Sequence, residues 1–177
     1  MFSHDIITIY TDGAARGNPG RGGFASIVVF GNDSHIELGG KAEHTTNNKM
    51  ELRGVIEGLK AVLKHGPETY TKVHVNSDSK YVLQGITTWI HGWKKNNWRT
   101  ASKAPVLNQE LWQELDNVRN KVVKLPIEIE WSYVKGHSEN VWNARADEIA
   151  TTCADDEAML DGEVKVFYEG PCIPSRV

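Results

Sequence analysis

The residues with the clearest chemistry are four carboxylates that lie far apart in the chain: Asp12, Glu51, Asp78 and Asp147. Carboxylate oxygens are hard ligands that suit Mg²⁺, with Mn²⁺ as a substitute. A cluster holding two such ions would activate a water molecule and stabilise a leaving oxygen, which is the chemistry of phosphodiester hydrolysis. The prediction of such a site depends on whether the elements of the fold bring the four side chains together.

Three elements bring the first three carboxylates together. Residues Ile6–Thr11 and Val73–Ser77 are apolar, β-branched runs typical of buried strands. A helix from about Lys49 to His65, with Asn47 or Asn48 as its N-cap, connects them. A right-handed crossover makes the two strands parallel neighbours, so that Asp12 and Asp78, which directly follow them, end at the same edge of the sheet. Glu51 lies in the first turn of the connecting helix, at the rim of its buried face.

The other elements complete a mixed α/β pattern. Five glycines between Asp12 and Gly23 predict a loop that exposes its backbone. Two strands, Phe24–Phe30 and Ile36–Ala42, then form an antiparallel meander with the first. The buried stripe of the helix is predicted as Leu52, Val55, Ile56, Leu59, Val62 and Leu63. Later elements are helices at Ser79–His91 and Asn108–Val123, a strand at Ile127–Val134, and a helix at about Asn140–Cys153 that carries Asp147.

Length and composition predict one domain. The chain has 177 residues, of which 40% are hydrophobic and 24% charged, and it lacks the roughly 18-residue apolar run of a membrane span. We expect a catalytic domain at residues 1–153 and an acidic appendage at 154–177, with a short strand at Val164–Tyr168. The only cysteines, Cys153 and Cys172, exclude a disulfide framework and leave room for one bridge between them. With no basic-then-apolar N-terminal pattern, the expected location is the cytoplasm.

The order of elements and five sequence stretches together resemble the bacterial type 1 ribonuclease H family. The stretches are TDGAARGNPG, TTNNKMEL, NSDSKYVLQGI, WIHGWKKNNW and VKGHSENVWNARADEIA. The resemblance implies a ribonuclease H-like fold, with a five-stranded mixed sheet of three antiparallel and two parallel strands flanked by helices. It also implies a monomer that cleaves the RNA strand of RNA–DNA hybrids. The cut would leave 3′-hydroxyl and 5′-phosphate ends and use two Mg²⁺ ions on Asp12, Glu51, Asp78 and Asp147.

Other residues receive roles from the same resemblance. His137, in a polar loop ten residues before Asp147, would assist proton transfer or product release, and its loss would slow the reaction without abolishing it. Asn18, Thr46, Asn47 and Asn48 would line the groove that binds the hybrid. Lys80 departs from the family pattern, since relatives often carry Gln there, and a point charge attracts phosphate without an amide's paired donor and acceptor.

A basic segment follows Lys80. Residues 79–109 contain no acidic side chain, and tryptophans alternate with cations along this run. The segment resembles the family's basic handle, which engages the DNA strand, although Asn96, Ala104 and Leu107 replace residues that are often basic. The predicted substrate contacts in it are Trp89, Trp93, Lys94, Lys95, Trp98 and Arg99. Binding to a polyanion through this handle should weaken steeply with salt.

Alternative readings apply to these residues one at a time. A lone Asp after a strand is commonly a turn or capping residue. Glu51 alone would be a partner of the helix dipole, and Asp147 alone a solvated residue or a partner of Arg145 or Lys135. For the whole chain, two other functions stay open: a DNA-cutting, integrase-like member of the wider superfamily, and a hybrid-binding module with an inactive site. Assaying cleavage of an RNA–DNA hybrid and of duplex DNA side by side distinguishes these functions.

Overall fold

The computed structural model describes residues 5–31, 33–66, 69–135 and 140–172. The strands are β1 (Ile6–Ala15), β2 (Gly20–Phe30), β3 (Ser34–Thr45), β4 (Lys72–Ser77), β5 (Glu128–Tyr133) and β6 (Val164–Pro171). The helices are α1 (Asn47–His65), α2 (Lys80–Gln84), α3 (Ile90–Lys95), α4 (Gln109–Val123) and α5 (Val141–Asp155), and a π-helical turn, η1 (Gly85–Trp89), joins α2 to α3. Among the described residues no helix is both long and apolar enough to cross a bilayer.

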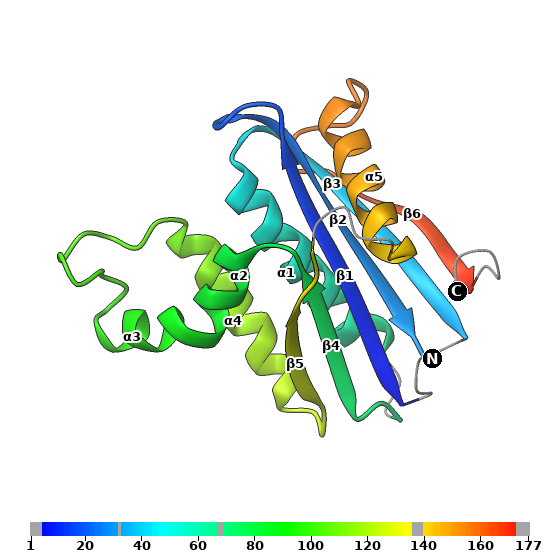
Figure 1. Cartoon of the computed structure of the whole chain (residues 1–177), viewed down its shortest axis with the longest axis horizontal. Helices are drawn as coiled ribbons and strands as arrows, with labels where there is room; N and C mark the ends of the chain where they lie inside the picture. The colour runs from blue at the N-terminus through cyan, green and yellow to red at the C-terminus, as the bar shows by residue number, and fades with distance from the viewer. Residues whose placement is uncertain (1–4, 32, 67–68, 136–139, 173–177) are drawn as a thin grey trace.

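The strands form one mixed sheet in the order β5-β4-β1-β2-β3-β6. Strands β1, β4 and β5 run parallel, while β2, β3 and β6 continue the sheet from β1 by antiparallel pairing. The prediction of parallel neighbours β1 and β4 is therefore confirmed. The prediction of five strands is wrong, because the C-terminal residues add β6 along β3 (Figure 1). The expected strand at Val164–Tyr168 is confirmed and extends to Pro171.

Two hydrophobic layers hold helices against the two faces of the sheet. The larger layer joins β1 and β4 to α1 and α4, with Leu52, Ile56 and Trp112 at its centre. The smaller layer lies under α5, where Trp142 and Ile149 meet the opposite face of β1 and β2 (Figure 1). The four predicted carboxylates therefore come from β1, from the residue after β4 and from helices on the two faces of the sheet.

Helix α1 begins earlier than predicted and has a different cap. The Thr46 hydroxyl accepts a hydrogen bond from the backbone N–H of Lys49 at 3.4 Å, so Asn47 and Asn48 belong to the helix and neither is its N-cap. The buried stripe agrees with the predicted one except at its end, where Leu63 is 36% exposed. A Thr hydroxyl three positions before the expected start satisfies the same orphan N–H groups, which is why the sequence pattern left the cap ambiguous.

The predicted glycine-rich loop is for the most part strand. β1 continues through Gly13 to Ala15 and β2 starts at Gly20, so only residues 16–19 connect them. The glycines serve close packing: a Cβ on Gly13 would lie 2.4 Å from the backbone N of Glu51, and one on Gly23 would lie 2.2 Å from the carbonyl O of Ala150. Here glycine removes side-chain volume so that α1 and α5 can approach the strands, which a count of glycines cannot distinguish from a loop.

Candidate functional site

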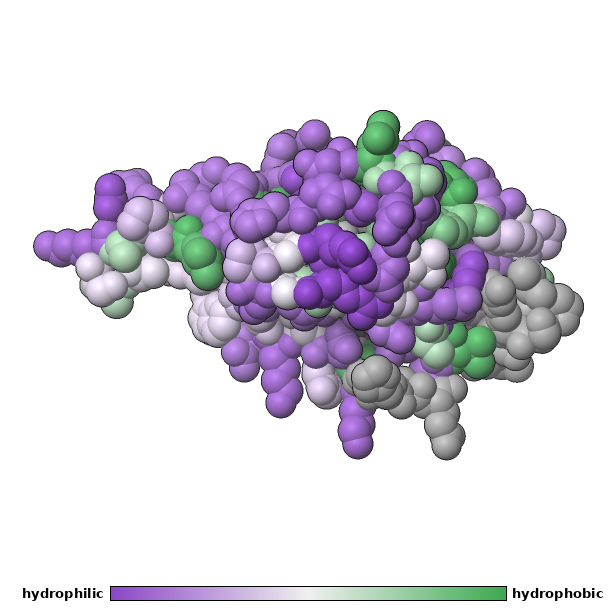
Figure 2. Space-filling view, turned by 90° about the horizontal axis from the view of Figure 1, so that it is seen from above, coloured by the Kyte–Doolittle hydropathy of each residue, from purple (hydrophilic) through white to green (hydrophobic). Residues whose placement is uncertain are grey.

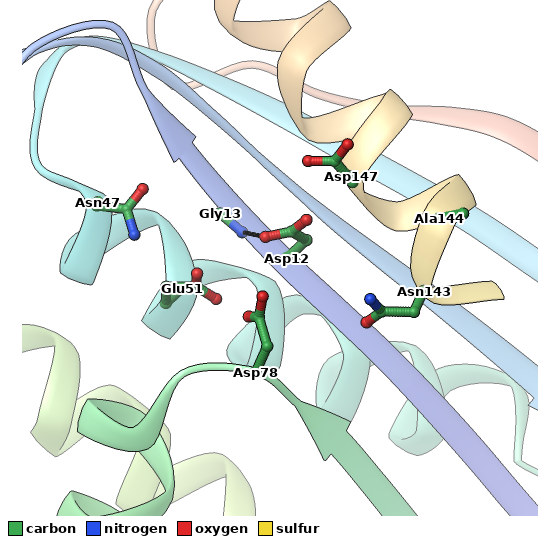
Figure 3. Close-up of a pocket in the computed structure, with 8 residues that line it drawn as sticks. All are labelled: Asp12, Gly13, Asn47, Glu51, Asp78, Asn143, Ala144 and Asp147. Carbon is green, nitrogen blue, oxygen red and sulfur yellow. Dashed lines mark hydrogen bonds between the residues drawn. The ribbon is translucent and has the colours of Figure 1, made fainter. Parts of the chain in front are cut away.

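Three of the predicted carboxylates form a compact cluster. One oxygen each of Asp12, Glu51 and Asp78 lies within 4.8 Å of the others, a spacing that would allow shared coordination of a cation. They line a cavity of about 420 Å³, together with Asp147 and four further residues: Gly13, Asn47, Asn143 and Ala144. Figure 3 shows these side chains converging from β1, α1, the end of β4 and α5. The predicted convergence of all four carboxylates on one cavity is confirmed.

The neighbouring backbone determines where each carboxylate lies. Asp12 is inside β1, paired with Ala25 of β2, and does not follow the strand as predicted. Its Oδ1 accepts a hydrogen bond from the Gly13 N–H at 2.7 Å (Figure 3). Asp78 directly follows β4, which pairs with β1 up to the Thr11–Ser77 pair. Glu51 was expected at a rim, yet it is only 4% exposed, because Gly13 lets the first turn of α1 rest directly on β1.

The crowded carboxylates make the site electrostatically strained when it holds no cation. Burial, followed by the charge of Asp78, raises the pKa of Asp12 to about 7. Burial is also the main cause that raises the pKa of Glu51, with the charges of Asp12 and Asp78 adding to it. The Oε2 atom of Glu51 is buried and has no hydrogen-bond partner among the described residues. A divalent cation would satisfy that oxygen and relieve the repulsion, so these residues fit a metal centre.

Asp147 enters the cavity from α5, separately from the other three. The N-cap of this helix is Asn140, whose side chain accepts hydrogen bonds from the N–H groups of Trp142 and Asn143. Asp147 also contributes to the raised pKa of Asp12 through its charge and a side-chain hydrogen bond. The alternative pairing of Asp147 with Arg145 is not what the structure shows, since Arg145 contacts Glu37 and Glu148. Asp147 is therefore part of the carboxylate site.

Sequence reasoning missed Asn143 as a cavity residue. Asn143 is 3% exposed and lines the cavity one helical turn before Asp147. The signal was present: a polar residue four positions before Asp147 lies on the same face of α5. Gly13 was also missed as a site residue, because its role in admitting Glu51 appears only once α1 is packed on β1.

The predicted groove residues lie beside the cavity. Asn47 lines it, and its backbone N–H donates to the Asn18 side-chain oxygen at 3.3 Å, which joins the β1–β2 connection to the start of α1. Thr46 and Asn48 flank Asn47 and are half-buried. Lys80 lies two residues after Asp78, with its Nζ 5.5 Å from the centre of the exposed Tyr133 ring, in a cation–π arrangement. His137 lies outside the described residues.

The basic segment projects from the body at one side of the sheet. Figure 2 views the molecule from the C-terminal ends of β1 and β4. It shows strongly hydrophilic side chains in the middle and the region around α3 extending to the left. Trp89 is 37% exposed, while Trp93 and Trp98 pack partly against the main core. Trp93 contacts the rings of Trp89, Trp98 and Trp112, with centroids 5.3 to 6.5 Å apart. The tryptophans thus form the base of the projection.

The cations of this segment differ in how far they are already paired. Lys94 lies 2.7 Å from Asp116 of α4, which Arg119 also contacts at 2.6 Å. Lys95 is exposed and makes no ion pair with the described residues. Arg99 donates to the carbonyl O of Lys103 at 2.9 Å and is otherwise exposed. Of the three predicted cationic contacts, Lys95 and Arg99 are therefore more available to a polyanion than Lys94.

Comparison with known proteins decides the family. The family model described as RNase H matches residues 4–155, which is most of the chain and contains all four carboxylates. The chain belongs to the ribonuclease H family. Members of this family are metal-dependent nucleases that cleave the RNA of RNA–DNA hybrids.

Two similar proteins are both named ribonuclease H. The ribonuclease H of Bradyrhizobium diazoefficiens is 51% identical over 145 residues, which cover 82% of this chain and 87% of the relative. The ribonuclease H of Thermosynechococcus vestitus is 49% identical over 145 residues, covering 82% and 86%. At this identity, and with this coverage, the likeness extends through the whole matched domain.

Solved structures agree with this assignment. LC9-RNase H1, described as a type 1 RNase H with the type 2 active-site motif, superposes with a TM-score of 0.74 and 27% identity over 94% of this chain and 79% of its own. LC11-RNase H1, solved in complex with an RNA/DNA hybrid, has a TM-score of 0.63 over 84% of this chain and 96% of its own, and its 24% identity supports the fold alone.

Proposed function

We propose that this chain is an endoribonuclease that cuts the RNA strand of RNA–DNA hybrids at the carboxylate cavity, leaving 3′-hydroxyl and 5′-phosphate ends. The observation that carries the proposal is the cluster of Asp12, Glu51 and Asp78, whose oxygens lie within 4.8 Å of one another, with Asp147 in the same cavity. Membership of the ribonuclease H family gives that cluster its reaction. We further propose that the protein acts as a monomer in the cytoplasm.

The four carboxylates would hold two Mg²⁺ ions, with Mn²⁺ as a substitute. When bound, such ions lower the pKa of the attacking water and neutralise charge on the leaving oxygen. The chain supplies the ligand set: carboxylates whose raised pKa values mean that cation binding displaces protons, so that binding should strengthen as the pH rises. His137 is proposed to assist proton transfer near this centre, so that its loss slows cleavage without abolishing it.

The residues around the cavity are suited to binding the sugar and phosphate groups of a nucleic acid. Asn18, Asn47 and Asn48 present donors and acceptors for 2′-hydroxyls and for the minor groove, which distinguish RNA and hybrid helices from DNA duplexes. Lys80, held over the Tyr133 ring beside Asp78, places a positive charge near the scissile strand. Lys95 and Arg99 on the projecting segment are placed to contact the phosphates of the second, DNA strand.

A cleavage assay on end-labelled substrates tests this proposal. We expect cutting of the RNA strand in a hybrid with Mg²⁺ present, and no cutting of duplex DNA or of free single-stranded RNA. The cut should leave a 3′-hydroxyl, which a polymerase can extend without phosphatase treatment. Cleavage of duplex DNA instead would favour an integrase-like activity. Retention of the hybrid without cleavage in either Mg²⁺ or Mn²⁺ would indicate a binding module.

A further inference from the structure

The C-terminal strand β6 lies beyond the residues that the family model matches, yet it is built into the sheet. β6 (Val164–Pro171) runs antiparallel to β3, with Glu37 opposite Tyr168 and His35 opposite Gly170. A register shift between Glu37 and Leu38 gives β6 one extra residue, Phe167. β6 lies at the edge of the sheet beside β3 (Figure 1). Its two consecutive aromatic side chains contact β3, Phe167 at Gly39 and Tyr168 at His35.

Tyr168 connects β6 to α5 through one buried side chain. Its ring stacks on His35 of β3, with centroids 4.5 Å apart and an interplanar angle of 22°. His35 is fully buried, and its ring also meets Trp142 of α5 at a centroid distance of 4.7 Å. Three rings from β6, β3 and α5 thus lie in sequence and connect the C-terminal strand to the start of α5.

Beneath these rings lies an ion pair between β3 and α5. Glu37 has a side chain with no exposed surface, and its Oε2 accepts hydrogen bonds from the Nε and Nη2 of Arg145 at 3.0 and 2.8 Å. The other oxygen of Glu37 is 3.5 Å from the Nε2 of His35. Glu37 has no exposed surface and Arg145 is 21% exposed, so separating them would leave an uncompensated charge on the buried Glu37. Tyr168 stacks on His35, which is the ring beside this pair.

Arg145 connects this ion pair to the carboxylate cavity. It lies between Asn143 and Asp147 on α5, and both of those side chains line the cavity. Asp12 and Asp78 are positioned by paired strands, whereas Asp147 is carried by a helix that rests on β2 at Gly23 and contacts β3 through Glu37 and His35. Phe167 strengthens the same contact: a Cβ on Gly39 would lie 2.6 Å from Ile149 and 2.8 Å from Phe167, so both pack over that glycine.

We propose that β6 positions the metal-binding face of α5, with Tyr168 as the positioning residue that acts through His35, Glu37 and Arg145 on Asp147. The inference rests on the proposed function only in assigning Asp147 as a metal ligand. It assigns β6 a role in shaping the site, although no residue of β6 lines the carboxylate cavity.

The test compares three substitutions in β6 by two measurements that need no catalysis. Tyr168→Ala removes the stacked ring, Tyr168→Phe keeps the ring and removes only the hydroxyl that donates to the Pro171 carbonyl, and Val166→Ala trims an exposed side chain that pairs with Leu38. Hydrogen–deuterium exchange in metal-free protein reports the mobility of residues 141–155, with α1 as an internal reference. Calorimetric titration with Mn²⁺ reports the affinity of the carboxylate site.

We expect Tyr168→Ala to speed exchange in residues 141–155 about tenfold and to raise the Mn²⁺ dissociation constant by about three- to tenfold, in line with the loss of outer support around metal ligands. Tyr168→Phe and Val166→Ala should match the wild type in both. Unchanged α5 exchange in Tyr168→Ala, or an equal rise in α1 and α5, would overturn the proposal. If the wild type bound no Mn²⁺, the proposed function would fail, and the exchange data would still judge the role of β6.

A second variant covers the case in which Tyr168→Ala does not fold. Glu37→Gln leaves β6 intact, preserves the shape of the side chain and removes the charge that Arg145 contacts. The same selective rise in α5 exchange is expected, because the helix loses its ionic contact with β3. Wild-type exchange across residues 141–155 in Glu37→Gln would contradict the proposed connection between β3 and Asp147.

Discussion

At the residue scale, Asp12 shows how the packing of several carboxylates in one cavity changes the pKa of a single group. One oxygen of its carboxyl group lies within 4.8 Å of oxygens of Glu51 and Asp78, and its pKa is raised from an ordinary value near 3.8 to about 7. The folded, metal-free protein therefore binds protons that the unfolded chain has already released between these pH values. Stability contributed by this protonation is fully present below about pH 4 and is lost as the pH rises through 7.

This sign gives a prediction for the metal-free protein. In EDTA, the free energy of unfolding contributed by the cluster should fall by about 2–4 kcal/mol between pH 5 and pH 8, since one pKa unit corresponds to about 1.4 kcal/mol. Urea denaturation at both pH values measures it. Asp12→Asn, which cannot ionise, should show a smaller fall, and Mg²⁺ should restore the wild type at pH 8. An equal fall in wild type and Asp12→Asn would show that Asp12 is not its source.

Residue types and spacing predicted the four carboxylates but not how deeply each is buried. Asp12 and Asp78 followed from strand topology, because parallel neighbours bring their ends together. The burial of Glu51 could not be predicted, since it depends on the absence of a Cβ at Gly13. Asn143 could have been found from its position four residues before Asp147, whereas the contact of Arg145 with Glu37 joins segments 108 residues apart and left no local signal.

At the scale of elements, the contact between β1 and α1 is the one that assembles the site. The glycine content of the segment after Asp12 predicted a loop, but most of that segment is strand. Its glycines are there because α1 and α5 approach β1 and β2 more closely than a side chain would allow. The bounds predicted for α1, α4 and α5 are within two residues of those observed, whereas the single helix predicted at Ser79–His91 is α2, a π-helical turn and α3, which continues to Lys95. The N-cap of α1 could not be predicted, because Thr46, Asn47 and Asn48 are all competent N-cap residues and packing chooses among them.

Two glycine substitutions test this contact. A Cβ on Gly13 would lie 2.4 Å from the N of Glu51 and 2.6 Å from the carbonyl C of Met50, so Gly13→Ala must displace the first turn of α1. We expect a loss of about 2–4 kcal/mol in stability and a Mg²⁺ requirement raised at least tenfold. Gly92→Ala in α3 is the matched control, since nothing lies within 4 Å of its Cβ, and it should be neutral or slightly stabilising. A Gly13→Ala variant with wild-type stability and Mg²⁺ dependence would contradict this account.

For the molecule as a whole, the sequence predicted a mixed sheet flanked by helices but one strand too few. The sixth strand was foreseen only as a short segment, because its alternating pattern is weak and its acidic surroundings resemble a solvated tail. Its position beside β3 depends on pairing with residues about 130 positions earlier in the chain. Cys153 and Cys172 are both free thiols, so no disulfide fixes this end of the chain.

The distribution of charge over the molecule governs binding to nucleic acid. The overall charge is −3, and six of the acidic side chains lie among the last 25 residues, while residues 79–109 carry none. Hybrid affinity should therefore fall steeply with salt despite the negative total charge.

Lys95→Ala should reduce the slope of log affinity against log salt by about 0.7–0.9, the value for one lost phosphate contact. Lys60→Ala, whose side chain is paired with Glu57 and Glu114, should leave the slope unchanged. Equal slopes for Lys95→Ala and wild type would exclude Lys95 from the interface.

The central claim, that this chain hydrolyses hybrids at the Asp12 carboxylate cluster through bound divalent cations, is tested most directly by single-turnover cleavage of a labelled RNA–DNA hybrid. The wild type and Asp12→Asn are compared in Mg²⁺ and in EDTA, after both are shown to be folded. We predict cleavage by the wild type in Mg²⁺, none in EDTA, and a rate at least about 10³-fold lower for Asp12→Asn. Cleavage by Asp12→Asn at the wild-type rate, or cleavage by the wild type in EDTA, would contradict the account.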